Sequence, residues 1–184
     1  MKNNIHIFSK NECVTKSGIM EKIGLRGRQA MEFAALDLPI LPGFIIDSDV
    51  AAHLEGTDLK PVLKASFKKI EQLTGKVFGD PKNPLLIKVV ISPNLAIVHY
   101  PNLHNFGLTE NTIPGFNKFV GEDFGYHEVL YLLSGYLEIE AKILELEKKD
   151  NKAAELRKKI SVLSGELKSK TKSAEFRKLF DEYK

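Results

Sequence analysis

Two glycines and two arginines stand close together in a pattern that can bind an anion. Gly24, Arg26, Gly27 and Arg28 directly precede a helix that the sequence predicts over Gln29 to Leu36. The start of a helix carries unpaired N–H groups and the positive end of the helix dipole, so glycines and cations placed there suit a phosphate. The same residues also suit a surface loop with solvated arginines. From the residues alone the loop is favoured, and the phosphate site is kept as the alternative.

A second candidate for chemistry is the histidine-containing segment from His99 to Asn105. It holds His99 and His104 in a stretch that is typical of a polar loop. A protein zinc site usually has three or four cysteine, histidine or carboxylate ligands. Neither a cysteine nor a nearby carboxylate completes such a set here. We therefore expect these histidines to be surface loop residues, and we assign no metal ligand.

The remaining elements are organised around the stretch FGDPKNPLLIKVV, from Phe78 to Val90. Turn-forming residues fill the positions from Gly79 to Pro84, and an apolar run of strand length follows from Leu85. This pattern predicts a rigid surface turn that leads into a buried strand. A second apolar run, Leu95 to Val98, is expected to be the hairpin partner or the continuation of that strand.

Shorter patterns on both sides of this stretch predict further helices and strands. In the N-terminal part, strands are predicted at Ile5 to Phe8 and at Phe44 to Ile46. A helix capped by Asp47 or Ser48 is predicted to run to about Leu54. A further helix is predicted over Leu59 to Leu73, with Gly75 as its C-cap. From Glu122 onward the chain is predicted to be helical. Apolar stripes over Val129 to Leu146 and Leu156 to Leu167, with a charged break between them, predict an antiparallel helical hairpin, and a last short helix carries Phe176 to Tyr183. The sequence leaves open whether the stripes pack within the chain or on a second chain.

Composition narrows the class of protein. The chain has 27 basic and 24 acidic residues, and this net charge of +3 is too small to predict a nucleic-acid partner. Cys13 is the single cysteine, so no intrachain disulfide can form and a reducing compartment is expected. The sequence shows no signal-peptide pattern and no apolar run of about 18 residues. We therefore expect a cytoplasmic protein with no membrane partner.

Three motifs resemble the N-terminal, nucleotide-binding region of the pyruvate phosphate dikinase family. They are GLRGRQAMEFAALDLPILPGF, IEQLTGKVFGDPKNPLL, and GLTENTIPGF with NKFVGEDFGY. The similarity extends over Gly18 to Tyr126 and returns weakly over Phe176 to Lys184. The resemblance implies an α/β (α+β) fold in which residues 1–115 form the first lobe of an ATP-grasp fold and residues 116–184 form a helical subdomain. It also implies ATP bound between this lobe and a second one, with magnesium.

The sequence departs from this family at positions that should carry charge. Arg26 matches the family's phosphate-facing lysine, but Leu25 replaces a glycine beside it. Val90 stands where the family has an arginine, and Leu130 and Tyr131 stand where it has an arginine pair. The second ATP-grasp lobe would begin where the printed sequence ends. Phosphoryl transfer depends on cations around the transferred group, so these departures predict that the chain alone is catalytically inactive.

Three functions are consistent with these features. The favoured one is a pseudoenzyme that serves as a binding module, either for a nucleotide or phosphorylated metabolite at Gly24, Arg26, Gly27 and Arg28 or for a protein partner. It predicts weak ATP binding at most, leaves magnesium undecided and assigns no catalytic residue. The second is one part of a split ATP-dependent dikinase completed by another chain. The third is an assembly or adapter protein that forms a homo-oligomer through its C-terminal helices.

Overall fold

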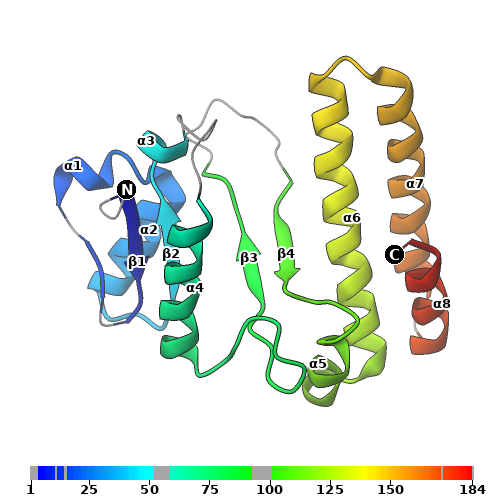
Figure 1. Ribbon diagram of the computed structural model, residues 1–184, viewed down its shortest axis with the longest axis horizontal. Coiled ribbons are helices and arrows are strands. Elements are labelled where there is room, and N and C mark those ends of the chain that lie inside the picture. The colour runs from blue at the N-terminus through cyan, green and yellow to red at the C-terminus, as the bar shows by residue number, and fades with distance from the viewer. Residues whose placement is uncertain are drawn as a thin grey trace. The chain divides into compact units, whose positions relative to one another are not determined.

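The computed structural model describes residues 4–10, 12–14, 16–51, 59–92, 101–170 and 172–183. Within these residues the fold is α+β, with eight helices and two antiparallel sheets of two strands each (Figure 1). The α+β prediction is therefore confirmed. The chain divides into two compact units, Met1–Gly75 with Ile91–Val98 and Lys76–Val90 with His99–Lys184. The boundary expected after residue 115 stays a prediction.

The first unit holds a two-stranded sheet and four helices. Strands β1 (Ile5–Phe8) and β2 (Gly43–Ile46) pair antiparallel with Phe8 opposite Gly43, which confirms both predicted strands. A Cβ atom on Gly43 would lie 2.4 Å from the Phe8 ring, so the pairing requires a residue without a side chain. The helices are α1 (Ser17–Met20), α2 (Gly24–Ala35), α3 (Ser48–Ala51) and α4 (Lys60–Thr74).

Helix α2 begins at Gly24, five residues before the predicted start at Gln29, so that boundary was wrong. The reason is tertiary packing of the first turn. Gly27 is buried, and a Cβ atom on it would lie 3.0 Å from the Cβ of Ile23 and 3.1 Å from the Cδ1 of Ile45. Because glycine lets this turn approach β2 closely, the helix extends beyond its apolar sequence pattern.

Asp47 links β2 to α3, as the sequence predicts for a helix cap. Its Oδ1 accepts hydrogen bonds from the N–H groups of Asp49 (3.1 Å) and Val50 (3.3 Å). Its Oδ2 lies 3.2 Å from Nε2 of the buried His6. The helix end expected near Leu54 lies outside the described residues. Gly75, with φ 68°, ends α4 as predicted.

The second unit contains strands β3 (Ile87–Val89) and β4 (Leu103–Phe106), which pair antiparallel. The prediction of a buried strand was wrong, because Val89 and Val90 are 45% and 39% exposed. Among the described residues β4 is the only partner of β3, and a sheet of two strands covers few of its side chains. The pairing also corrects the polar-loop assignment of residues 103–105. The predicted partner, Leu95 to Val98, lies outside the described residues.

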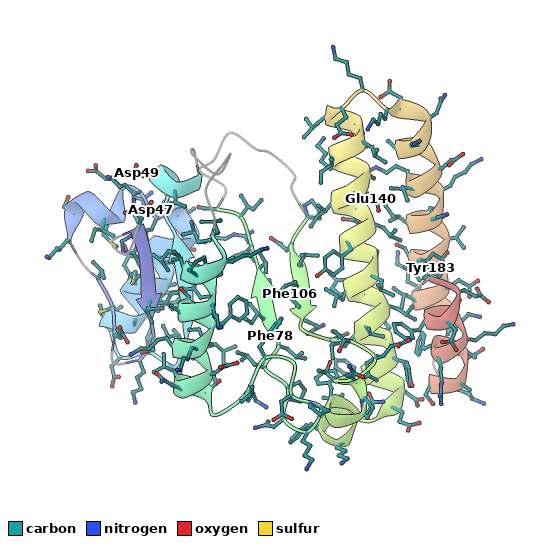
Figure 2. All side chains as sticks on the ribbon, in the orientation of Figure 1. Asp47, Asp49, Phe78, Phe106, Glu140 and Tyr183 are labelled. Carbon is teal, nitrogen blue, oxygen red and sulfur yellow. The ribbon has the colours of Figure 1, made fainter. Side chains whose placement is uncertain are left out.

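A turn precedes β3, as predicted, and the side chain of Asp80 holds it. Asp80 accepts hydrogen bonds from the N–H groups of Lys82 (2.7 Å) and Asn83 (3.4 Å). The Phe78 ring packs on the Phe106 ring of β4, with 5.4 Å between centroids (Figure 2). The turn is therefore fixed both internally and against the strand pair that follows it.

Helix α5 (Ile113–Val120) lies directly against this turn. A Cβ atom on Gly115 would be 2.1 Å from the carbonyl oxygen of Pro81, so the two backbones are in contact. At the start of α5, the fully buried Thr112 donates a hydrogen bond to the Gly107 carbonyl (2.9 Å) and accepts one from the Thr109 N–H (2.8 Å). These contacts leave no space for a larger residue at Gly115.

The C-terminal helices confirm the predicted hairpin. Helices α6 (Glu122–Leu146) and α7 (Asp150–Ser169) lie side by side, and α8 (Ser173–Tyr183) packs on α6 (Figure 1). Leu130 and Leu163 are 0% exposed at the centre of their shared core, so the apolar stripes pack largely within the chain. None of the helices in the described part is long and apolar enough to cross a membrane.

Replacing Gly115 with alanine tests the contact between the turn and α5. Gly115→Ala is expected to lower the free energy of unfolding by about 1–3 kcal/mol, because the new methyl group forces the Pro81 backbone away. Denaturant unfolding measures this change. The matched control is Gly165→Ala in α7, where an added Cβ meets no atom within 4 Å and alanine should stabilise the helix by about 0.5–1 kcal/mol. Equal effects of the two variants would contradict this account.

Candidate functional site

The candidate anion site of the first unit lies at the start of α2. Gly24 has φ 65°, a conformation that favours glycine, and it leads the helix. The N-cap residue Ile23 provides no side-chain hydrogen bond, and the first turn holds no acidic residue. The side chain of Ile23 therefore does not cap the first turn, and no carboxylate of that turn repels an anion.

The structure gives the two arginines and Gly27 different surroundings. Arg26 is exposed, whereas Arg28 is half-buried and its buried Nε has no hydrogen-bond partner among the described residues. A buried donor without an acceptor costs about 1–3 kcal/mol, and an anion at this place would supply the acceptor. Gly27, by contrast, is explained by its packing on Ile45. The residues at the start of α2 therefore fit an anion, with Arg28 as the side chain that lacks a partner.

A further cation near α2 is already engaged. Lys22 forms an ion pair with Asp49, with 2.5 Å between Nζ and Oδ2. This hydrogen bond and the charge of Asp49 raise the pKa of Lys22. The charge of Lys22 is thus paired with Asp49 of α3.

Val90, Leu130 and Tyr131 of the second unit stand at positions where the resemblance leads us to expect cations. They do not form a cationic site. Val90 is an apolar side chain just after β3, and Leu130 is fully buried in the helical core. Tyr131 is 45% exposed, and its ring lies 5.4 Å from that of His104 on β4. An aromatic contact thus occupies the place expected for a guanidinium.

Sequence reasoning missed a small pocket of about 130 Å³ beside this aromatic contact. Its lining residues come from α6 and from the segment around β4: Pro101, Asn102, His104, Tyr131, Ser134, Gly135 and Glu138. The spacing of Tyr131, Ser134 and Glu138 places them on one face of a helix, which the sequence could have indicated. The approach of β4 to that face is a tertiary contact with no local signal.

The surroundings of His104 lower the pKa of its imidazole. Burial lowers the pKa of its imidazole, the charge of Lys88 lowers it further, and Glu128 acts in the opposite direction. His104 is thereby disposed to be neutral near pH 7. No group of three or more potential metal ligands occurs among the described residues. The absence of a metal site stays a prediction, since His99 lies outside those residues.

Comparison with known proteins identifies relatives of the chain. No family model matches it. Among curated proteins, pyruvate, phosphate dikinase from Treponema pallidum (strain Nichols) is 45% identical over 152 residues, which cover 83% of this chain and 17% of that protein. The same-named protein from Rickettsia bellii (strain RML369-C) is 33% identical over 48% of this chain and 11% of its own length. Pyruvate, phosphate dikinase 2 from Zea mays is 27% identical over 65% of this chain and 14% of its own length.

The titration of His104 can be checked by NMR. We expect Lys88→Met to raise the pKa of His104, because a neighbouring cation is removed, and Glu128→Gln to lower it. Lys82→Met, which removes an exposed cation of the turn, is the control and should leave this pKa unchanged. Because the pKa is lower in the folded than in the unfolded chain, the contribution of His104 to stability is lost as pH falls through about 6.5. A His104 pKa above that of an unfolded peptide would contradict this assignment.

Proposed function

This chain is related by sequence to the pyruvate, phosphate dikinase family, and we propose that it is a binding module for a nucleotide or phosphorylated metabolite that does not itself transfer phosphate. It spans 17% of the length of its Treponema pallidum relative. We further propose that it corresponds to the first, nucleotide-binding lobe of an ATP-grasp fold, because the motifs from Gly24 to Phe44 and from Phe78 to Leu86 resemble that region.

The observation that carries the proposal is the burial of Leu130. This residue is 0% exposed among the apolar side chains of α6, α7 and α8, where the resemblance places one arginine of a pair. Val90 likewise replaces an arginine with an apolar side chain. Loss of a single preorganised donor typically lowers an enzyme's rate by about 10²–10³. Several such losses leave little stabilisation for a migrating phosphoryl group.

Binding requires less than catalysis, and the start of α2 retains what binding needs. The N–H groups of the first helical turn, the exposed Arg26 and the buried Nε of Arg28 are donors that suit a phosphate. In the family, ATP supplies the phosphoryl group, and magnesium neutralises its oxygens. The described residues contain no ligand cluster for magnesium, so we assign the ion no role here. The proposed contact is a phosphate held by N–H donors and arginine.

Ligand titration tests this proposal. ATP, AMP and phosphoenolpyruvate are expected to bind with dissociation constants on the order of 1 mM, as weak sites with few charged contacts do. Arg28→Ala should weaken binding about tenfold or more, since it removes a charge-assisted hydrogen bond. Lys64→Ala, an exposed cation on α4, is the matched control and should change nothing. Calorimetry and thermal shifts measure both.

Three results would contradict the proposal or a part of it. An absence of both heat and thermal shift at millimolar ligand would remove the binding role. Transfer of phosphate from ATP to any acceptor by the purified chain alone would remove the claim of inactivity. An unchanged affinity in Arg28→Ala, with binding otherwise intact, would place the ligand elsewhere and contradict the α2 site.

A further inference from the structure

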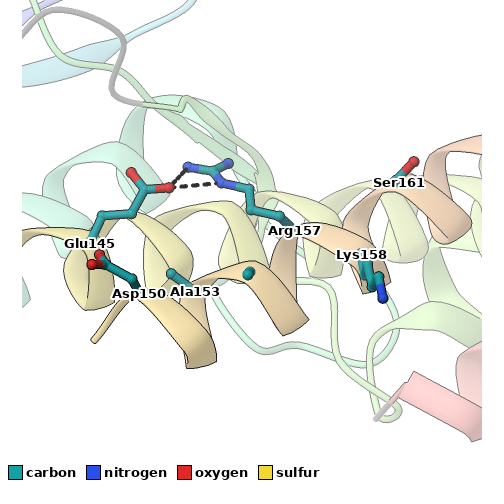
Figure 3. Close-up of a pocket in the computed structure, with 7 residues that line it drawn as sticks. Glu145, Asp150, Ala153, Arg157, Lys158 and Ser161 are labelled. Atoms are coloured by element: carbon teal, nitrogen blue, oxygen red, sulfur yellow. Dashed lines mark hydrogen bonds and ion pairs between the residues drawn. The ribbon is translucent and has the colours of Figure 1, made fainter. Parts of the chain in front are cut away.

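A shallow hollow of about 510 Å³ opens beside the junction of α6 and α7 (Figure 3). Its lining residues are Glu145, Asp150, Ala153, Ala154, Arg157, Lys158 and Ser161. Ala153 is 3% exposed and forms its floor, while charged side chains surround it. The hollow therefore combines a small apolar floor with both acidic and basic groups.

Most of the lining residues follow one face of α7. Asp150, Ala154, Lys158 and Ser161 are spaced by four, four and three residues, and all are exposed. Gly165 continues the same face, where an added Cβ would meet no atom within 4 Å. We call Asp150, Ala154 and Lys158 the α7 face. Between its two charged ends lies a single methyl group, so another helix can approach closely there.

The charges of the α7 face differ in how they are satisfied. Arg157, at the edge of the hollow, binds Glu145 through Nε (3.0 Å) and Nη2 (2.8 Å), and this contact lowers the pKa of Glu145. Asp150 and Lys158 have no ion pair among the described residues. They lie on either side of Ala154, four residues away in each direction. The α7 face therefore presents one free acid and one free base placed symmetrically about an alanine.

We propose that the α7 face binds the same face of a second copy of this chain, with the two helices antiparallel and the two-fold axis at Ala154. In such an arrangement Asp150 faces the partner's Lys158, and Lys158 faces the partner's Asp150, because a two-fold interface repeats every contact. Ala154 meets its own copy at the axis, where its small side chain permits close packing. This interface uses no residue of the α2 site, so it stands independently of the proposed function.

Sedimentation of the full chain over a range of concentrations tests the proposal. We expect a monomer–dimer equilibrium that weakens as salt is added, since exposed ion pairs are screened. Asp150→Lys and Lys158→Asp should each weaken dimerisation about tenfold or more, because each turns two attractions into two repulsions. An equimolar mixture of these two variants should form a heterodimer with two attractive ion pairs, one between the two introduced side chains and one between the unchanged Lys158 and the partner's Asp150. Reassociation in the mixture also shows that both variants are folded.

The matched control is Lys159→Asp, the same charge reversal at the next exposed residue, which points away from the α7 face. It should leave the dimer unchanged. A wild-type chain that stays monomeric at several hundred micromolar would overturn the proposal. So would a dimer that survives both single reversals, or two monomeric variants that fail to associate when mixed.

Discussion

The contact between the turn at Pro81 and helix α5 at Gly115 sets the geometry of the second unit. Two backbones approach there to a distance at which a Cβ atom would lie 2.1 Å from a carbonyl oxygen. A similar restriction holds at Gly107, which has φ 116° and whose Cβ would lie 2.8 Å from the Leu85 carbonyl. Because glycine alone allows both approaches, the turn, the strand pair and α5 are held at fixed spacing.

Helix α6 is the central element of the helical core in the second unit. Helix α6 follows α5 after Gly121 and packs on β4, α7 and α8, which together bury Leu130. A guanidinium at this position would be a charge without a partner in an apolar core, at a cost of several kcal/mol. The apolar residue at Leu130 is therefore coupled to the packing of the helical hairpin. Leu130 thus contributes to a continuous core that a charged side chain at the same position would interrupt.

The sequence predicted those elements whose signals are local. The Asp47 cap, the C-terminal Gly75 and the stripes of the hairpin depend on residues within a few positions of one another, and all three are confirmed. The errors arose where tertiary contacts decide the structure. Burial of Gly27 against Ile45 moved the start of α2, and pairing with β3 made a strand of residues 103–105. At the candidate site, the sequence itself shows Arg26 and Arg28. The buried Nε of Arg28, which has no partner among the described residues, depends on tertiary packing and could not be predicted.

Binding and catalysis place different demands on an anion site. A phosphate is bound in its ground state by any donors that reach its oxygens, and the start of α2 supplies N–H groups and arginines within one helical turn. Catalysis requires donors that bind the transition state more strongly than the ground state. Such donors must stand around the transferred group from several directions, whereas binding needs only donors that reach the ground state. A site with few donors is therefore expected to lose rate before it loses affinity.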